Sequence, residues 1–124
     1  MKKTIIIDTN AWMAFHEFNL DLFAALEETC DFHYKIAVLQ GTIEELRKII
    51  TEQRGRFKQA ALLALGIIKV KKVEIINETG NVDDILVEYS KKENLVLTQD
   101  IALKKRLRKP YLTIRQKKKI IIVK

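Results

Sequence analysis

Four acidic residues follow or border apolar segments of this sequence, where a carboxylate is costly to bury. In chain order they are Asp8, Glu45, Asp83 and Asp100. Asp8 directly follows the apolar run at residues 4–7, and Asp100 closes the segment 95–99. A carboxylate that loses water needs a compensating charge, and carboxylate oxygens suit a divalent cation. The pattern therefore predicts a divalent-metal site.

The charge of the chain is distributed unevenly. Residues 1–100 carry 13 Lys or Arg and 16 Asp or Glu, a net charge of −3, whereas residues 101–124 carry ten basic and no acidic residues. A basic segment beside an acidic cluster suits a protein that cuts phosphodiesters, because the cations hold the polyanion while metals neutralise the acids. A solubilising or disordered tail is the alternative, but the β-branched run at 120–123 favours a strand there.

Several classes of protein are excluded by composition. The 124 residues, 48% of them hydrophobic, fit one globular domain over 1–124, and no apolar run approaches the roughly 20 residues of a membrane span. Cys30 is the only cysteine, which excludes an internal disulfide and a cysteine-based zinc site. We therefore expect a cytoplasmic protein. A glycine-rich phosphate loop and a Ser or Cys nucleophile with an orienting base are both absent.

The apolar pattern predicts the elements that position these acids. Strands are expected at 3–7, 36–39, 73–76, 95–97, 112–114 and 120–123, and helices at 9–18, 20–30, 43–50, 57–65, 81–93 and 102–108. Thr42 is the expected N-cap of the third helix, and Gly66 is expected to end the fourth. Such alternation predicts an α/β fold, a parallel sheet with helices on both faces. Asp8 and Asp100, both at carboxyl ends of strands, share a crevice if their strands are neighbours.

Two of the acids belong to acidic pairs, and ideal helix geometry distinguishes the members. In the helix after the second expected strand, Glu45 lies beside the apolar face while Glu44 points further toward solvent. In the helix before the fourth expected strand, Asp83 borders the apolar face and Asp84 lies nearly opposite. Because the margins are about 40–50° at 100° per residue, both assignments need a direct test.

Each acid also has a purely structural interpretation. Glu45 completes a capping box with Thr42, and Asp83 favours the positive end of a helix. Asp100 serves equally well as a helix N-cap. Asp8 is the hardest to explain structurally, because an acid directly after a buried strand is an uncommon choice. The joint pattern is more specific than any of its members.

That joint pattern resembles the PIN-domain nucleases over nearly the whole chain. The matching segments are IIIDTNA, TIEEL, VDDIL and VLTQDIALKKRLRK. The last segment is similar to the branch that processes ribosomal RNA and to small archaeal proteins grouped with bacterial-type toxins. The resemblance implies a three-layer α/β/α fold in which Asp8, Glu45, Asp83 and Asp100 form the acidic quartet, with Asn10 and Thr98 as supporting polar residues.

The resemblance implies an endoribonuclease that depends on Mg²⁺ or Mn²⁺. Asp8 and Asp100 are expected to bind the metal directly, and Asp83 directly or through water. Glu45 would orient the attacking water or hold a second metal. One ion would activate that water, and a second would stabilise the leaving oxygen. The resemblance also implies a homodimer, and an antitoxin or a ribosomal precursor as partner besides RNA.

The basic segment is expected to contact the substrate. Its four candidate phosphate ligands are placed on one helix directly after Asp100, next to the metal crevice: Lys104, Lys105, Arg106 and Arg108. A solvated helix face is the alternative, in which case the strand enters elsewhere, over residues 117–119.

Two other functions remain open at this point. One is an RNA-binding or ribosome-assembly scaffold of PIN fold with little or no catalysis, against which the intact quartet argues. The other is a receiver-like domain with Asp8 as phosphoacceptor. Receiver-like domains usually carry paired acids after the first strand, whereas Asp8 directly follows Ile7.

Overall fold

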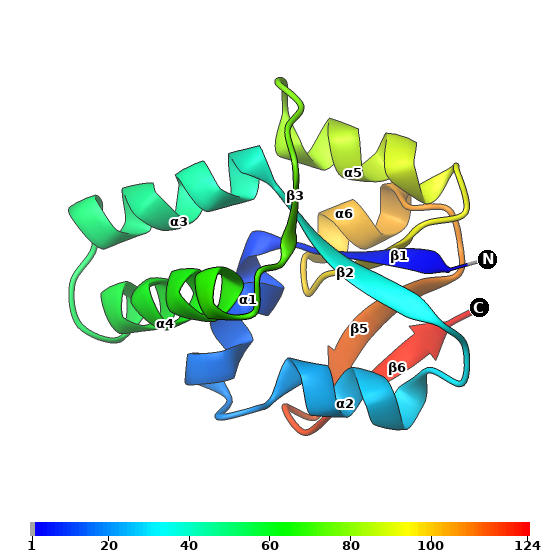
Figure 1. The fold of residues 1–124 in the computed structure, drawn as a ribbon, viewed down its shortest axis with the longest axis horizontal. Coiled ribbons are helices and arrows are strands. Elements are labelled where there is room, and N and C mark those ends of the chain that lie inside the picture. The colour runs from blue at the N-terminus through cyan, green and yellow to red at the C-terminus, as the bar shows by residue number, and fades with distance from the viewer. Residues whose placement is uncertain (1) are drawn as a thin grey trace.

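Strands and helices alternate through residues 2–124, the part of the chain that the structure, a computed structural model, describes (Figure 1). The strands are β1 Lys3–Ile7, β2 Tyr34–Leu39, β3 Glu74–Ile76, β4 Leu95–Leu97, β5 Tyr111–Arg115 and β6 Lys119–Val123. The helices are α1 Thr9–Glu17, α2 Leu22–Thr29, α3 Gln40–Glu52, α4 Arg56–Val70, α5 Val82–Ser90 and α6 Ile101–Arg106.

The six strands form one sheet in the order β3-β2-β1-β4-β5-β6. Strands β1 to β5 pair in parallel, and β6 pairs antiparallel with β5. The expectation of a parallel sheet thus holds for five strands. The sixth reverses because only residues 116–118 join it to β5, and a parallel connection needs a crossover of about a dozen residues or more.

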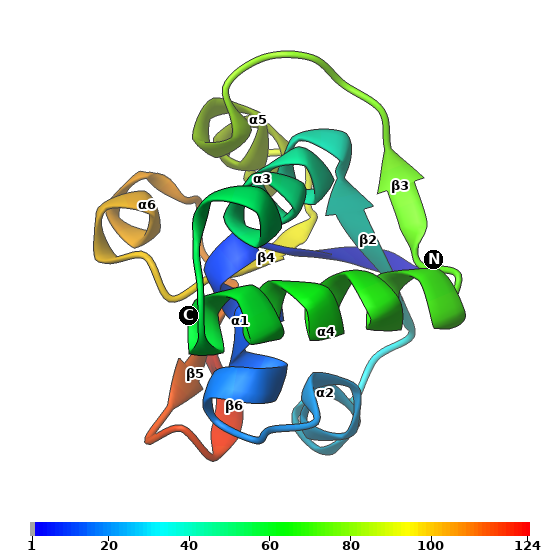
Figure 2. The ribbon, with the colours of Figure 1, turned by 90° about the vertical axis from the view of Figure 1, so that its left-hand side faces the viewer.

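Both faces of the sheet are covered, as expected, because successive side chains of β1 point in opposite directions. Ile5 and Ile7 belong to one core cluster with α1, α2, α3 and α4, whereas Ile6 belongs to the other with α5 and α6. Figure 2 shows α5 and α6 on one side of the strands and α2 and α4 on the other. All three isoleucines are fully buried, and each contributes roughly 1.5–3 kcal/mol by burial.

Helix α1 begins directly after Asp8 and carries the tryptophan of the chain into the core. Trp12 is fully buried and packs against Phe15 and Phe23, with ring centroids 6.2 Å away in both cases. Its backbone N–H donates to the carbonyl of Asp8 at 3.0 Å, while its indole N–H has no hydrogen-bond partner within residues 2–124. Packing of Trp12 therefore holds the first turn of α1 against the sheet.

Three expected helix limits were wrong. Helix α3 has Leu39, not Thr42, as its N-cap, and the Thr42 side chain is buried inside the helix. Gly66 lies inside α4, which continues to Val70 because Ile68 is still buried, and that burial outweighs the roughly 1 kcal/mol cost of a helical glycine. Helix α6 ends at Arg106, so Arg108 lies outside it.

None of the described helices is long and apolar enough to cross a membrane.

Candidate active site

Asp8 lies at the carboxyl end of β1 in the middle of the sheet. Its backbone N–H donates to the carbonyl of Leu97 in β4 at 2.9 Å, which continues the pairing of the two strands. The residue is only 6% exposed. Oδ1 accepts the backbone N–H of Thr9, and Oδ2 accepts the hydroxyl of Thr98, both at 2.8 Å. These bonds fix the carboxylate at the end of the strand.

The surroundings of Asp8 disfavour its negative charge. Burial raises the pKa of its carboxyl from 3.8 to about 6, against the hydrogen bonds from Thr98 and Thr9, which lower it. The negative charges of Asp83 and Glu45 make a smaller contribution to the same rise in pKa. Three acids from β1, α3 and α5 are therefore close enough to interact electrically, and a cation among them would relieve their repulsion.

Glu45 reaches the end of β1 through a hydrogen bond. Its Oε1 accepts the hydroxyl of Thr9 at 2.7 Å, across 36 residues of sequence. The side chain is exposed, so the carboxylate faces solvent as well as Thr9. The capping-box interpretation of Glu45 is wrong, because Thr42 does not cap α3.

Asp83 lies in the first turn of α5 and faces the start of α3. The two helices approach closely at Gly41, where a Cβ atom would lie 2.6 Å from Cγ2 of Val82. Glu45, Asp83 and Lys48 line a depression of about 370 Å³ between these helix ends. The absence of a side chain at Gly41 thus lets Glu45 and Asp83 share one depression.

The second member of each acidic pair has different neighbours. Asp84 accepts a hydrogen bond from Nη2 of Arg106 at 2.6 Å, an ion pair between exposed groups. The negative charge of Asp84 is therefore already matched by a cation. Glu44 is exposed and lines the same depression as Glu45, but it has no bond corresponding to that of Glu45 with Thr9.

Thr98, Gln99 and Asp100 follow β4 and connect the remaining candidate residues. Oγ1 of Thr98 accepts the backbone N–H of Asp100 at 3.1 Å while it donates to Asp8. Asp100 also caps α6, because its Oδ1 accepts the N–H of Leu103 at 3.1 Å. The N-cap interpretation is thus realised, and this bond engages only one carboxylate oxygen. Oδ1 of Asn10 accepts the N–H of Gln99 at 3.2 Å.

The arrangement was tested against the chemistry of a divalent ion. Within residues 2–124, no three His, Cys, Asp or Glu side chains converge closely enough to enclose a metal. The available donors are carboxylate oxygens at an open edge, one of them desolvated and raised in pKa by burial and by its acidic neighbours. Such a set fits Mg²⁺ or Mn²⁺, which retain several waters and use few carboxylates. It does not resemble a closed site for zinc.

The four basic residues expected on one helix are separated. Lys104, Lys105 and Arg106 lie in α6, and Arg106 is paired with Asp84. Arg108 lies past the helix, where its N–H donates to Oγ of Ser90 at 3.1 Å and its Nη1 donates to the carbonyl of Lys91 at 3.2 Å. Ser90 and Lys91 end α5 at the opposite edge of the sheet from Asp8. Placing Arg108 next to the metal crevice was therefore wrong.

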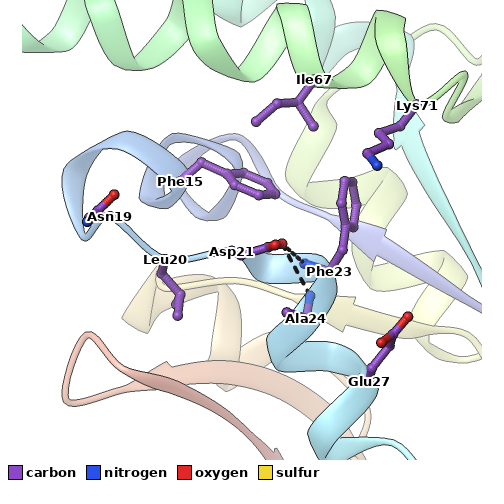
Figure 3. A pocket seen from close by; sticks show the side chains of 9 residues that line it. All are labelled: Phe15, Asn19, Leu20, Asp21, Phe23, Ala24, Glu27, Ile67 and Lys71. Carbon is purple, nitrogen blue, oxygen red and sulfur yellow. Dashed lines mark hydrogen bonds between the residues drawn. The ribbon is translucent and has the colours of Figure 1, made fainter.

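A larger cavity of about 580 Å³ lies elsewhere, between α1, α2 and α4 (Figure 3). None of the candidate site residues lines it. Two acids line it, Asp21 and Glu27, and Asp21 serves as the N-cap of α2 by accepting the backbone N–H groups of Phe23 and Ala24. The candidate acids are therefore at the carboxyl edge of the sheet rather than in this larger cavity.

Two residues that organise the site, Thr9 and Gln99, were not among the candidates predicted from the sequence. Thr9 donates to Glu45, and Oε1 of Gln99 accepts from the hydroxyl of Thr113 and the N–H of Ile114, both at 2.8 Å. Their positions in the sequence could have indicated this role, since each is a polar residue adjacent to a candidate acid at the end of a strand.

Comparisons with known proteins find a family and two similar proteins. The model of the PIN-like domain family matches residues 5–117, a segment that includes all four acids. Ribonuclease VapC4 of Methanocaldococcus jannaschii is 28% identical over 122 residues, with 92% of both chains covered. The solved structure of the PIN domain endonuclease Utp24 is similar with a TM-score of 0.76 and 26% identity, covering 96% of this chain and 90% of that one.

The family match covers most of the chain, and the structural match extends over the six-stranded sheet and its helices. The α/β fold and the resemblance inferred from the sequence motifs are both confirmed. The chain belongs to the PIN-like domain family.

Proposed function

We propose that this chain is a metal-dependent endoribonuclease that hydrolyses RNA phosphodiester bonds at the carboxyl edge of its sheet. The observation that carries the proposal is the buried carboxyl of Asp8, whose pKa is raised to about 6 in the presence of Glu45 and Asp83. Maintaining such a cluster without a cation is costly. The family and the names of the two similar proteins, a ribonuclease and an endonuclease, support the same reaction class.

In this proposal Asp8 and Asp100 would bind the ion directly and Asp83 would bind it through a water molecule, because no three acids converge within the described residues. Thr98 and Thr9 keep the Asp8 carboxylate oriented by donating to its two oxygens. When bound, Mg²⁺ or Mn²⁺ supplies the Lewis acidity that phosphodiester hydrolysis needs. Glu45 has Oε1 held by Thr9, so its Oε2 accepts a hydrogen bond from the attacking water.

The supporting residues act through backbone geometry. Asn10 accepts the N–H of Gln99 and thereby joins the start of α1 to the segment after β4. This bond holds Asp8 and Asp100 at a fixed separation while substrate enters. We assign Asn10 and Thr98 as positioning residues, because the contacts they make are with the chain rather than with a reacting group.

We further propose the partners that the resemblance to PIN-domain nucleases implies. RNA is the substrate, and the protein works in the cytoplasm as a homodimer with either an antitoxin or a ribosomal precursor as its partner. Those two roles differ in what the neighbouring genes encode. A small antitoxin-like reading frame beside this gene favours the toxin role, and ribosome-assembly genes favour maturation.

A scaffold of PIN fold that binds RNA with little or no catalysis is the second candidate. Two observations favour it: no three acids converge within the described chain, and Asp100 serves as the N-cap of α6. The two candidates make opposite predictions about cleavage when a divalent ion is supplied.

The deciding experiment incubates the purified chain with structured and unstructured RNA in Mg²⁺, in Mn²⁺ and in EDTA. We expect cleavage with either ion and none in EDTA. Asp8→Asn should lower the rate on the order of 100-fold or more, judged from losses at metal-site residues. The matched control is Asp31→Asn, an exposed acid outside the site, which should cut at the wild-type rate.

Cleavage that persists after chelation and dialysis would overturn the metal mechanism. Tight RNA binding without cleavage in either ion would favour the scaffold. Equal rates for Asp8→Asn and the wild type would remove Asp8 from the site.

A further inference from the structure

The turn between β5 and β6 carries a dense group of cations. Residues Arg115–Lys119, here named the basic hairpin tip, contain four Lys or Arg and one Gln, and all five are exposed. Leu112 of β5 is level with Leu97 of β4, which is level with Ile7 just before Asp8. Arg115 is three residues beyond Leu112, so the tip projects about 10 Å past that level at ~3.3 Å per residue.

The basic hairpin tip is therefore on the same edge of the sheet as the acids. Figure 2, which faces this edge, shows the turn below α6 and beside the end of β5. Gln99 fixes its position, because Oε1 accepts from the hydroxyl of Thr113 and the N–H of Ile114 at the base of the turn. The N–H of the same Gln99 donates to Asn10. The base of the tip is thus connected through Gln99 to Asn10, two residues after Asp8.

The charges of the basic hairpin tip are not compensated by acids. Arg115 lies directly opposite Lys119 in the antiparallel pair, and like charges at such positions destabilise a hairpin. None of the ion pairs found within residues 2–124 includes a residue of the tip. Lys117 is instead over the ring of Phe18, with Nζ 5.6 Å from its centroid. An anion bound between Arg115 and Lys119 would remove their repulsion.

Helix α6 offers less free charge at this edge. Arg106 is neutralised by Asp84, and Arg108 is held at the opposite edge by Ser90 and Lys91. That leaves Lys104 and Lys105, against four cations on the basic hairpin tip. The tip is therefore the larger uncompensated cluster beside Asp8.

We propose that the basic hairpin tip binds the phosphates of the RNA strand and holds the strand across the acidic edge. This inference rests on the proposed function, since it names the element that binds that substrate. Arg115, Lys118 and Lys119 supply the phosphate contacts, while Lys117 stabilises the tip through Phe18. The basic residues of α6 then contact RNA only where the strand leaves the site.

The test measures RNA affinity without cleavage. All variants carry Asp8→Asn and are titrated in EDTA with a fluorescently labelled single-stranded RNA, over a series of KCl concentrations. The test variant combines Lys118→Glu with Lys119→Glu. The control combines Lys109→Glu with Lys124→Glu, two exposed residues near the opposite edge with the same change in net charge.

We expect the test variant to bind RNA at least roughly tenfold more weakly. The slope of log binding constant against log KCl concentration should become less negative by about 1.4, which is ~0.7 for each of two lost phosphate contacts. The control should change affinity less than about twofold and leave the slope intact. The melting temperature of the test variant should not fall, because Lys119→Glu places a carboxylate opposite Arg115. Weaker binding is then a loss of contacts and not of folding.

An unchanged slope in the test variant, or equal weakening in the control, would overturn the inference. Cleavage by the wild-type chain in Mn²⁺ is measured separately. If the wild-type chain cuts RNA but the salt slope of the test variant is unchanged, only this inference is rejected and the proposed function stands. If the wild-type chain does not cut RNA but the test variant binds RNA more weakly than the control, only the proposed catalysis is rejected.

Discussion

The hydroxyl of Thr98 donates to Oδ2 of Asp8 at 2.8 Å and accepts the backbone N–H of Asp100 at 3.1 Å. A single oxygen thus connects the ends of β1 and β4, which carry the two central acids. Because a hydroxyl is both donor and acceptor, it holds the ionised Asp8 and the first turn of α6 together. Replacing it affects both.

Thr98→Val preserves shape and removes this hydroxyl. The pKa of Asp8 should rise above about 6, because the lost hydrogen bond lowers it in the native chain. Activity should fall by about 10–100-fold, as for other partners of metal ligands. The pKa is followed by carboxyl NMR in the metal-free chain. Thr29→Val, which removes a hydroxyl bonded to Ile120 at a remote site, is the control and should leave this pKa unchanged.

Asp8→Asn should stabilise the metal-free chain at neutral pH. The folded-state pKa of Asp8 is raised from 3.8 to about 6, so its contribution to stability is complete below pH 3.8 and is lost as pH rises through about 6. At pH 7 this cost is up to about 3 kcal/mol. Urea unfolding at pH 4 and pH 7 should show the variant gaining only at pH 7. A gain of equal size at both pH values would contradict the assignment.

Asp83→Asn should lose far more activity than Asp84→Asn. Asp83 acts electrically on Asp8, whereas Asp84 is paired with Arg106. Likewise Glu45→Gln should lose more than Glu44→Gln, because Glu45 is held by Thr9. RNA cleavage rates in Mn²⁺ decide both comparisons. Equal losses within a pair would mean that both acids serve the site, and a reversed order would reject the assignment.

Gly41→Ala should damage the site, whereas Gly66→Ala should only stabilise the chain. A Cβ at position 41 would lie 2.6 Å from Cγ2 of Val82, so the Val82 side chain or the two helices must shift, at a cost of about 1–3 kcal/mol. Nothing lies within 4 Å of a Cβ at position 66, which is exposed within α4, so alanine should add about 0.5–1 kcal/mol. Unfolding and cleavage are measured together, and full activity in Gly41→Ala would reject the role of this approach.

The fold was predictable because its local patterns agree with its tertiary packing. The continuous apolar run of β1 indicated a strand buried on both faces, and Ile5, Ile6 and Ile7 are buried in the two clusters. Parallel pairing of β1 with β4 then placed Asp8 and Asp100 at the same edge. The position of two candidate acids therefore followed from the strand ends and this pairing.

The rest depended on contacts between elements, which periodicity within one element cannot show. Thr9 meets Glu45 across 36 residues. Thr42 had a good capping sequence, yet burial of Ile43 and Leu46 on the α3 face accompanies a helix that starts earlier, at Gln40. Arg108 was misplaced because α6 is only six residues long and leads back along the sheet. The position of the β5–β6 turn could not be predicted without knowing the register between β4 and β5.

The packing of Trp12 supplies this protein with an internal optical reporter. It is the single tryptophan of the chain, it is fully buried, and its indole N–H has no partner within residues 2–124. Emission in the native state should therefore be blue-shifted and should move to longer wavelength on unfolding. Because the backbone N–H of Trp12 donates to the carbonyl of Asp8, an ion that binds at Asp8 as proposed should change the same signal, with no label attached.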